Sequence, residues 1–208
     1  MPLIRIPLDA LGANASDAAE FQPEAVVESA VDSRRRAARE LPRDPASIPV
    51  IADCLAYEDD PRVRDALFGR IMDIGGTPAA ELLGQLIRSD NAGLRGGAIE
   101  GLKRLKSASV AVLDMLMTDS DSDVRLLAIE VTRSWPCNLA MPRLRRVFDQ
   151  ETHVNVCIAA VDVATEVGTE DLLPSLDALQ GRFADEPFLT FAIEVACARI
   201  RGDRDRAN

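Results

Sequence analysis

The chain has 208 residues and a formal net charge of −10, with 47% apolar residues but only 4% aromatic residues. Because Ala, Leu, Val and Ile must then supply most of the packing, the composition favours close helix–helix contacts over an aromatic-rich β-sandwich. The negative charge disfavours general binding to nucleic acids or to anionic membranes, since both are themselves negatively charged.

Residues 1–23 are predicted to form an N-terminal extension ahead of a leading helix from Glu24 to Leu41. The opening MPLIRIPL is too short for the apolar region of a secretion signal. No apolar stretch reaches the roughly 18 residues that a membrane span needs. The cysteines are dispersed without a CxxC pair, which indicates buried free thiols in a reducing cytoplasm. They are Cys54, Cys137, Cys157 and Cys197.

The rest of the chain carries a repeat of 30 or 31 residues, marked by an arginine that Asn155 replaces in the fifth copy. Four positions before each of the last four of these markers stands a short polar or acidic side chain. The repeat arginines are Arg34, Arg64, Arg95 and Arg125, and the preceding polar residues are Asp60, Asn91, Asp121 and Glu151. Since several columns agree in register, the chain is predicted to be an array of similar units.

Each unit reads as two helices joined by a short turn. Asp60, Asn91 and Asp121 precede a helix, where a short polar side chain can accept hydrogen bonds from free backbone N–H groups. An apolar pattern near a period of 3.6 follows. Neither helix can bury its apolar stripe alone, so the units must stack. The predicted pairs span about 46–74, 78–106, 108–134, 139–167 and 170–200, and a polar tail follows at 201–208.

The motifs DPRVRDALFGRI, NAGLRGGAIEGL and DSDVRLLAIEVT resemble the HEAT-like (PBS-lyase-type) repeat family, and the resemblance covers residues 24–200. It implies an all-α fold, a right-handed α-solenoid of about five helical hairpins behind a leading N-terminal helix. In that family the first helix of each pair lines the convex face and the second lines the concave groove. Recurring Asp and Arg residues form a ladder between units, and the fifth unit departs from this pattern with Glu151 and Asn155.

The residue types argue against catalysis. His153 is the only histidine, so a zinc or iron site would need carboxylates almost alone. The paired His-Glu motifs of deoxyhypusine hydroxylase, a HEAT-repeat enzyme, are missing. A Ser or Cys nucleophile would have only His153 as its base. The glycines of AGLRGGAIEG are interpreted as close-packing positions rather than a phosphate loop. No catalytic residue, cofactor site or metal ligand is therefore predicted.

Two arginine clusters are interpreted as solvated helix faces, with docking to an acidic protein segment as the alternative. One cluster holds Arg34, Arg35, Arg36 and Arg39, and the other holds Arg143, Arg145 and Arg146. Trp135 lies in a predicted inter-helix turn. Its ring is interpreted as packing against the neighbouring unit rather than as a binding anchor.

The predicted function is a non-catalytic protein–protein interaction module, an adaptor, scaffold or regulatory subunit that binds a protein partner through the groove. The alternative is a bilin lyase-like subunit that assembles a cofactor, which rests on family analogy. Positions one, five and eight after the repeat arginine are expected to point into the groove. The partner-binding residues chosen on this basis are Arg35, Arg39, Glu100, Lys103, Glu130, Arg133, Val156, Ala160 and Val163.

The groove is therefore expected to run from basic, through mixed charge, to apolar. Its apolar end lies in the segment VNVCIAAVDVA, which is apolar nearly all round and must be covered by something. The terminal helix around Phe188 and Phe191, or the LIRIPL arm, would cover it. Alternatively this patch docks a partner or a second copy of the chain, which would give a homodimer.

Overall fold

A computed structural model of the protein describes residues 23–207, with side chains described for residues 30–202. Apart from Pro23, the predicted N-terminal extension lies outside the described residues. Over 23–207 every regular element is helical. No helix in this part of the chain is both long enough and apolar enough to cross a membrane.

A leading helix is followed by five helical pairs, as the repeat predicts. The helices are α1 (Pro23–Glu40), α2 (Ile48–Tyr57), α3 (Pro61–Ile74), α4 (Gly76–Leu86), α5 (Ala92–Leu105), α6 (Val110–Leu116), α7 (Ser122–Thr132), α8 (Cys137–Gln150), α9 (Val154–Val167), α10 (Leu173–Arg182) and α11 (Pro187–Ala207). Short 3-10 turns lead into three of them, namely η2 (Pro45–Ser47), η3 (Lys106–Ser109) and η4 (Glu170–Leu172). Helix α11 continues to Ala207, which lies within the segment predicted as a polar tail.

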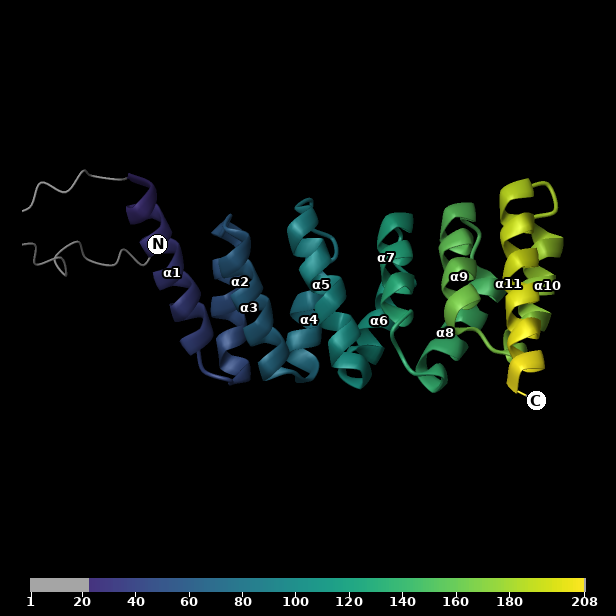
Figure 1. Cartoon of the computed structure of the whole chain (residues 1–208), viewed down its shortest axis with the longest axis horizontal. Helices are drawn as coiled ribbons and strands as arrows, with labels where there is room; N and C mark the ends of the chain where they lie inside the picture. The colour runs from purple at the N-terminus through teal and green to yellow at the C-terminus, as the bar shows by residue number, and fades with distance from the viewer. Residues whose placement is uncertain (1–22, 208) are drawn as a thin grey trace, which may run out of the picture.

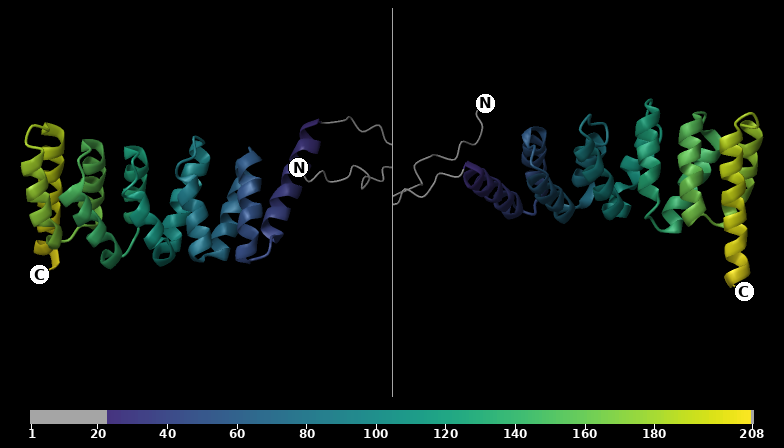
Figure 2. Two further views of the ribbon diagram at one scale, coloured as in Figure 1. Left: turned by 180° about the vertical axis from the view of Figure 1, so that it is seen from behind. Right: turned by 45° about the horizontal axis from the view of Figure 1, so that its top comes forward.

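The helices form two layers. In one layer, called the odd-helix layer, α1, α3, α5, α7, α9 and α11 contact one another in that order. In the other, the even-helix layer, α2 contacts α4, α4 contacts α6, and α8 contacts α10. The pairs stand side by side along the long axis of the molecule (Figures 1 and 2), with α1 and α11 at opposite ends. This arrangement is an α-solenoid, in which each unit contacts mainly its neighbours.

Local chemistry fixes where the second helix of a pair begins. Asp60, Asn91 and Asp121 are the N-cap residues of α3, α5 and α7, as predicted. The Oδ1 atom of each accepts a hydrogen bond from the backbone N–H two residues ahead, at 2.9, 2.9 and 2.8 Å. Gly75 and Gly76 link α3 to α4 with φ values of 67° and 70°, a left-handed conformation that glycine adopts without steric cost.

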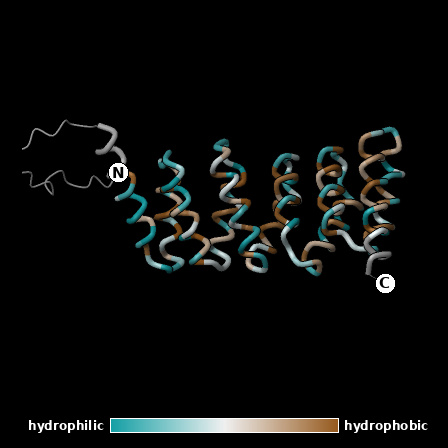
Figure 3. Tube along the Cα trace, in the orientation of Figure 1, coloured by the Kyte–Doolittle hydropathy of each residue, from teal (hydrophilic) through white to brown (hydrophobic). Residues whose placement is uncertain are grey.

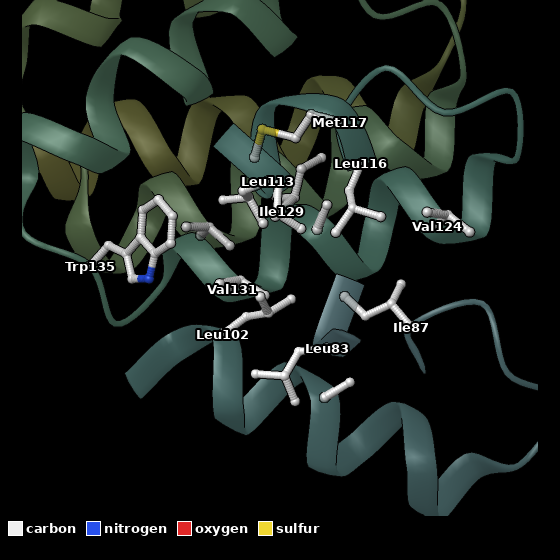
Figure 4. Packing of buried hydrophobic residues seen from close by; sticks show 14 of the residues in the cluster. Leu83, Ile87, Leu102, Leu113, Leu116, Met117, Val124, Ile129, Val131 and Trp135 are labelled. Atoms are coloured by element: carbon white, nitrogen blue, oxygen red, sulfur yellow. The ribbon is translucent and has the colours of Figure 1, made fainter. Parts of the chain in front are cut away.

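The core lies between the two layers, where each helix turns its apolar side toward its neighbours. Along the helices, short hydrophobic stretches of the trace alternate with hydrophilic ones (Figure 3). Leu83 of α4, Leu102 of α5, Leu113 of α6 and Ile129 of α7 are fully buried in one cluster (Figure 4). Burying each such side chain contributes roughly 1.5–3 kcal/mol relative to leaving it in water, so stacking of units supplies most of the stability.

Two glycines in AGLRGGAIEG allow α5 to approach its neighbours closely. A Cβ atom on Gly97 would lie 2.3 Å from the ring of Phe68, and one on Gly101 would lie 2.6 Å from Leu83. The segment is part of helix α5, so its backbone N–H groups serve the helix and do not form a phosphate loop. The close-packing interpretation is confirmed for Gly97 and Gly101 but not for Gly96, where a Cβ atom would meet nothing within 4 Å.

The ring of Trp135 packs inside the fold. Only 4% of the residue is exposed, and the guanidinium carbon of Arg143 lies 5.5 Å from the ring centroid. Arg143 also forms an ion pair with Asp114, with an N–O distance of 2.7 Å. The packing interpretation of Trp135 is confirmed, whereas Arg143 is not part of a solvated face, because the ring and the carboxylate hold it.

The cysteines divide into two groups. Cys157 and Cys197 are buried, as predicted, and burial raises the pKa of the Cys157 thiol to about 11. Cys54 and Cys137 are exposed, so the prediction of buried thiols is wrong for these two. Cys54 lies on the outward side of α2 and Cys137 is the first residue of α8, where a helix side chain is not enclosed.

Candidate binding surface

The predicted partner-binding residues all lie on the odd-helix layer, but they do not form one continuous surface. Arg35 and Arg39 lie on α1, and Glu100 and Lys103 lie on α5. These side chains reach the surface, fully or in part, as do those of Glu130 on α7 and of Arg133, the C-cap residue that follows α7. The three remaining residues, on α9, do not.

Val156, Ala160 and Val163 have no exposed surface, so the prediction that they line an open groove is wrong. Helix α9 contacts α7, α8 and α11, and its apolar residues on every side are used in these contacts. The terminal helix α11 covers α9 as expected, through buried Leu189 and Ile193. Phe188 and Phe191, around which this cover was expected, are instead 67% and 63% exposed, because they lie on the outward side of α11. No apolar patch for a partner or a second copy is left at these positions, and the described residues give no support to a homodimer there.

A shallow hollow of about 480 Å³ opens on the odd-helix layer between α1, α3 and α5. All of its lining residues come from these three helices, and therefore from three successive units of the repeat. Five of them are arginines, Arg35, Arg39, Arg62, Arg70 and Arg104. The acidic side chains in the lining are Asp65 and Asp73. We call this feature the basic hollow, because its arginines outnumber its carboxylates in a chain whose net charge is −10.

The ion pairs of the basic hollow differ in length, since Arg62 lies 3.2 Å from Asp60 but Arg35 lies 3.7 Å from Asp32. Arg70 is only 9% exposed, yet its Nη1 atom lies 3.6 Å from the nearer Asp73 oxygen. The same oxygen is 3.4 Å from Nη2 of Arg43, so one carboxylate serves two guanidinium groups. The Nε atom of Arg70 is buried and has no hydrogen-bond partner among the residues described. A buried guanidinium in this state is incompletely satisfied.

Two further arginines of the hollow have no polar partner among the described residues. Within the described part of the chain, neither Arg39 nor Arg104 has an ion pair or a side-chain hydrogen bond. A second hollow, of about 360 Å³ between α6, α7 and α8, has one such arginine, Arg146, and two arginines that are paired within the described residues. Its Arg125 is paired with Glu151 and its Arg143 with Asp114. The basic hollow therefore holds positive charge that the fold itself does not neutralise.

Further along the same layer the surface becomes acidic. Arg133 is the C-cap residue of α7. Its Nη2 atom lies 2.9 Å from Glu130 and 2.8 Å from Asp162, and Nη1 contacts Glu166. The hydrogen bond to Glu130 is the largest of several contacts that raise the pKa of Arg133. Three carboxylates surround one guanidinium, which leaves negative charge here. The surface thus runs from basic at α1 to acidic at α9, instead of ending in the predicted apolar patch.

The predicted ladder of polar contacts between units exists, but its rungs differ. Arg64 donates to Asn91 through Nη1 at 3.3 Å. Arg34 pairs with Glu58 instead of Asp60, at 2.9 Å. Arg95, in contrast, donates to the backbone carbonyl groups of Ser89 and Asp90. Arg34 and Arg64 therefore reach the loop of the next unit, whereas the contacts of Arg95 stay within its own pair of helices, α4 and α5.

The rung at the fifth unit, where the sequence departs from the repeat, has two short bonds. Nε and Nη2 of Arg125 donate to the two carboxylate oxygens of Glu151 at 2.8 and 3.0 Å. Glu151 also accepts hydrogen bonds from the backbone N–H groups of Thr152 and His153 at the start of α9. Glu151 thus links α7 to the start of α9, because its carboxylate binds the Arg125 side chain and two backbone N–H groups at the same time.

Glu151 makes the stability of the protein depend on pH. Burial opposes its ionisation, but the hydrogen bonds from Arg125, His153 and Thr152 outweigh burial and hold its pKa below the ordinary value of 4.5. Because the folded pKa is the lower one, the stabilisation is present above about pH 4.5 and is lost as pH falls through the folded pKa. We expect the difference in unfolding free energy between wild type and Glu151→Gln to shrink steadily below this pH. Urea unfolding followed by circular dichroism measures this difference at each pH. If the unfolding free energies of the two proteins change with pH in parallel, the assignment is contradicted.

The described residues hold no group of three or more His, Cys, Asp or Glu side chains that could bind a metal ion. His153 is exposed and occupies the N-cap position of α9. The odd-helix layer carries charged side chains at both ends, arginines near α1 and carboxylates near α9.

Sequence reasoning missed Arg62, Arg70 and Arg104, which complete the basic hollow. Arg104 lies nine positions after the repeat arginine Arg95, in the same register as Asp73 in the unit before. Residues one, five and nine positions after the repeat arginine lie on one side of a helix, just as residues one, five and eight positions after it do. Extending the pattern by one residue would have found Arg104, but nothing local marks Arg70.

No protein-family model and no curated protein matches this chain. Among solved structures it is similar to a designed armadillo repeat protein, YIII(Dq.V1)4CPAF, described in complex with the peptide (KR)4. The two chains share 14% sequence identity with a TM-score of 0.42, over 87% of this chain and 95% of the designed one. The helix order and the contacts of this chain by themselves define it as a helical repeat solenoid.

Proposed function

We propose that this chain is a HEAT-type interaction module that works in the cytoplasm and has no catalytic activity of its own. It binds an extended segment of a protein partner across the odd-helix layer, as an adaptor, scaffold or regulatory subunit. Solenoids offer a long surface relative to their core, which suits elongated partners. The bilin lyase-like alternative rests on the resemblance of the repeats alone.

The observation that carries this proposal is the uncompensated charge of the basic hollow. Of the arginines that line the basic hollow, Arg39 and Arg104 have no carboxylate partner among the described residues. Clustered like charges repel one another, which lowers stability. A protein partner that brings the opposite charge would relieve this repulsion on binding.

The test is a comparison of two charge reversals, each used as bait in a native extract. Arg39→Glu alters the odd-helix layer, whereas Arg145→Glu makes the same change at an exposed position of α8 in the even-helix layer. We expect Arg39→Glu to lose at least one protein that both wild type and Arg145→Glu retain, as quantified by mass spectrometry. Identical sets of proteins for all three baits, with unchanged circular dichroism, would contradict the proposal.

A further inference from the structure

We infer that the basic hollow is an anchoring site for the carboxylate side chains of an acidic segment, rich in Asp or Glu, of the partner protein. This inference rests on the proposed function and specifies the chemistry of the partner. Arg39 from α1, Arg70 from α3 and Arg104 from α5 line the same hollow. An extended acidic segment can therefore meet guanidinium groups from three successive units.

The state of Arg70 points to a ligand independently of the net charge. Its side chain is nine-tenths buried in the hollow, its Nε atom has no acceptor among the described residues, and Asp73 is 3.6 Å away. Desolvating a guanidinium without completing its hydrogen bonds is unfavourable. The Nε atom itself is enclosed, so a carboxylate that enters the hollow would meet the Nη side of the guanidinium, whose Nη1 atom is 3.6 Å from Asp73.

Gly69 borders open space in the hollow. It lies within α3 and lines the hollow, where glycine is less favourable for the helix than alanine would be. A Cβ atom at this position would meet no other heavy atom within 4 Å, so close packing does not explain the glycine, in contrast to Gly97. The space beside Gly69 is available to a ligand.

The lining favours carboxylates over a phosphate group. Phosphate sites commonly use the free N–H groups at a helix N-terminus, whereas the residues of this hollow lie after the first turn of their helices, apart from Arg62 at the start of α3. Asp65 and Asp73 also lie in the lining and would repel a compact dianion. Arginines spread over three helices suit several single negative charges, each held by a planar guanidinium.

The experiment measures binding of a fluorescein-labelled peptide of about eight alternating Glu and Gly residues to the full chain by fluorescence anisotropy. Arg39→Ala is expected to weaken binding about fivefold or more, because it removes a charge-assisted contact. Arg36→Ala is the matched control, since Arg36 is exposed on the same helix but does not line the hollow. Gly69→Gln should also abolish binding, by filling the hollow without changing its charge.

Asp65→Asn gives a result that a misfolded variant cannot mimic. Asp65 lines the hollow and is exposed, so removing its charge should tighten binding of the Glu peptide about three- to tenfold at low salt. Three outcomes overturn the inference: equal binding by wild type and Arg39→Ala, preference for a Lys–Gly peptide, or more than tenfold preference for a phosphoserine peptide of equal net charge.

The result is separable from the test of the proposed function. If the Glu peptide fails to bind while Arg39→Glu still loses a captured protein, the layer binds a partner but the acidic chemistry is wrong. If the Glu peptide binds the hollow but the Arg39→Glu bait captures the same proteins as wild type, the hollow recognises carboxylates and the proposed adaptor role is wrong.

Discussion

Val163→Asp is expected to lower the free energy of unfolding by at least about 3–5 kcal/mol, or to prevent the C-terminal units from folding. The side chain of Val163 has no exposed surface, so the new carboxylate would be placed in an apolar site without a partner. Chemical denaturation followed by circular dichroism measures the change. The same substitution at Val156 should have a similar effect for the same reason.

Val195→Asp is the matched control, because it makes the same change on the neighbouring helix α11 at a residue that is 43% exposed. We expect it to alter stability by less than about 1 kcal/mol. A Val163→Asp variant that folds like wild type but no longer binds a partner would show that α9 presents an open docking face after all.

Arg125→Ala is expected to lower stability by about 1–3 kcal/mol, since it strands the carboxylate of Glu151 in a mostly buried site. The side chains of this pair are only 15% and 8% exposed, and both bonds are short. A double-mutant cycle with Glu151→Ala isolates the energy of the pair from the other effects of each substitution. Thermal unfolding of the four proteins provides the data.

Arg64→Ala serves as the control for the ladder, because Arg64 makes a single hydrogen bond of 3.3 Å to a neutral acceptor, Asn91. Its removal should cost less than about 1 kcal/mol. Arg95→Ala should fall between the two, since Arg95 donates to two backbone carbonyl groups but has no carboxylate partner. Equal losses for Arg64→Ala and Arg125→Ala would contradict the view that the acceptor determines the strength of each rung.

The repeat and its caps could be predicted from the sequence because they depend on local chemistry. Asp60, Asn91 and Asp121 cap helices as expected, since capping needs only a short polar side chain beside free N–H groups. The partner of Arg34 was less predictable. A loop can offer more than one carboxylate, and Glu58 rather than Asp60 reaches the guanidinium.

The surface could be predicted only where neighbouring helices leave it open. Glu100, five positions after the repeat residue Arg95, is exposed. Ala160, five positions after the corresponding Asn155, is buried. The register of a residue gives the side of the helix on which it lies, but the packing of the next helix decides whether that side is covered. The basic hollow was not predicted as a site for the same reason, since three units must stack before Arg39, Arg70 and Arg104 meet.

Site-specific photo-cross-linking tests most directly whether the odd-helix layer is the binding surface. A photoreactive phenylalanine is placed at Asp65, on the exposed lining of the basic hollow, or at Met115, which is 64% exposed on α6 in the even-helix layer. After irradiation in native extract, we predict a discrete covalent adduct with a partner from position 65 and none from position 115. An adduct formed only from position 115 would show that the partner binds the opposite layer.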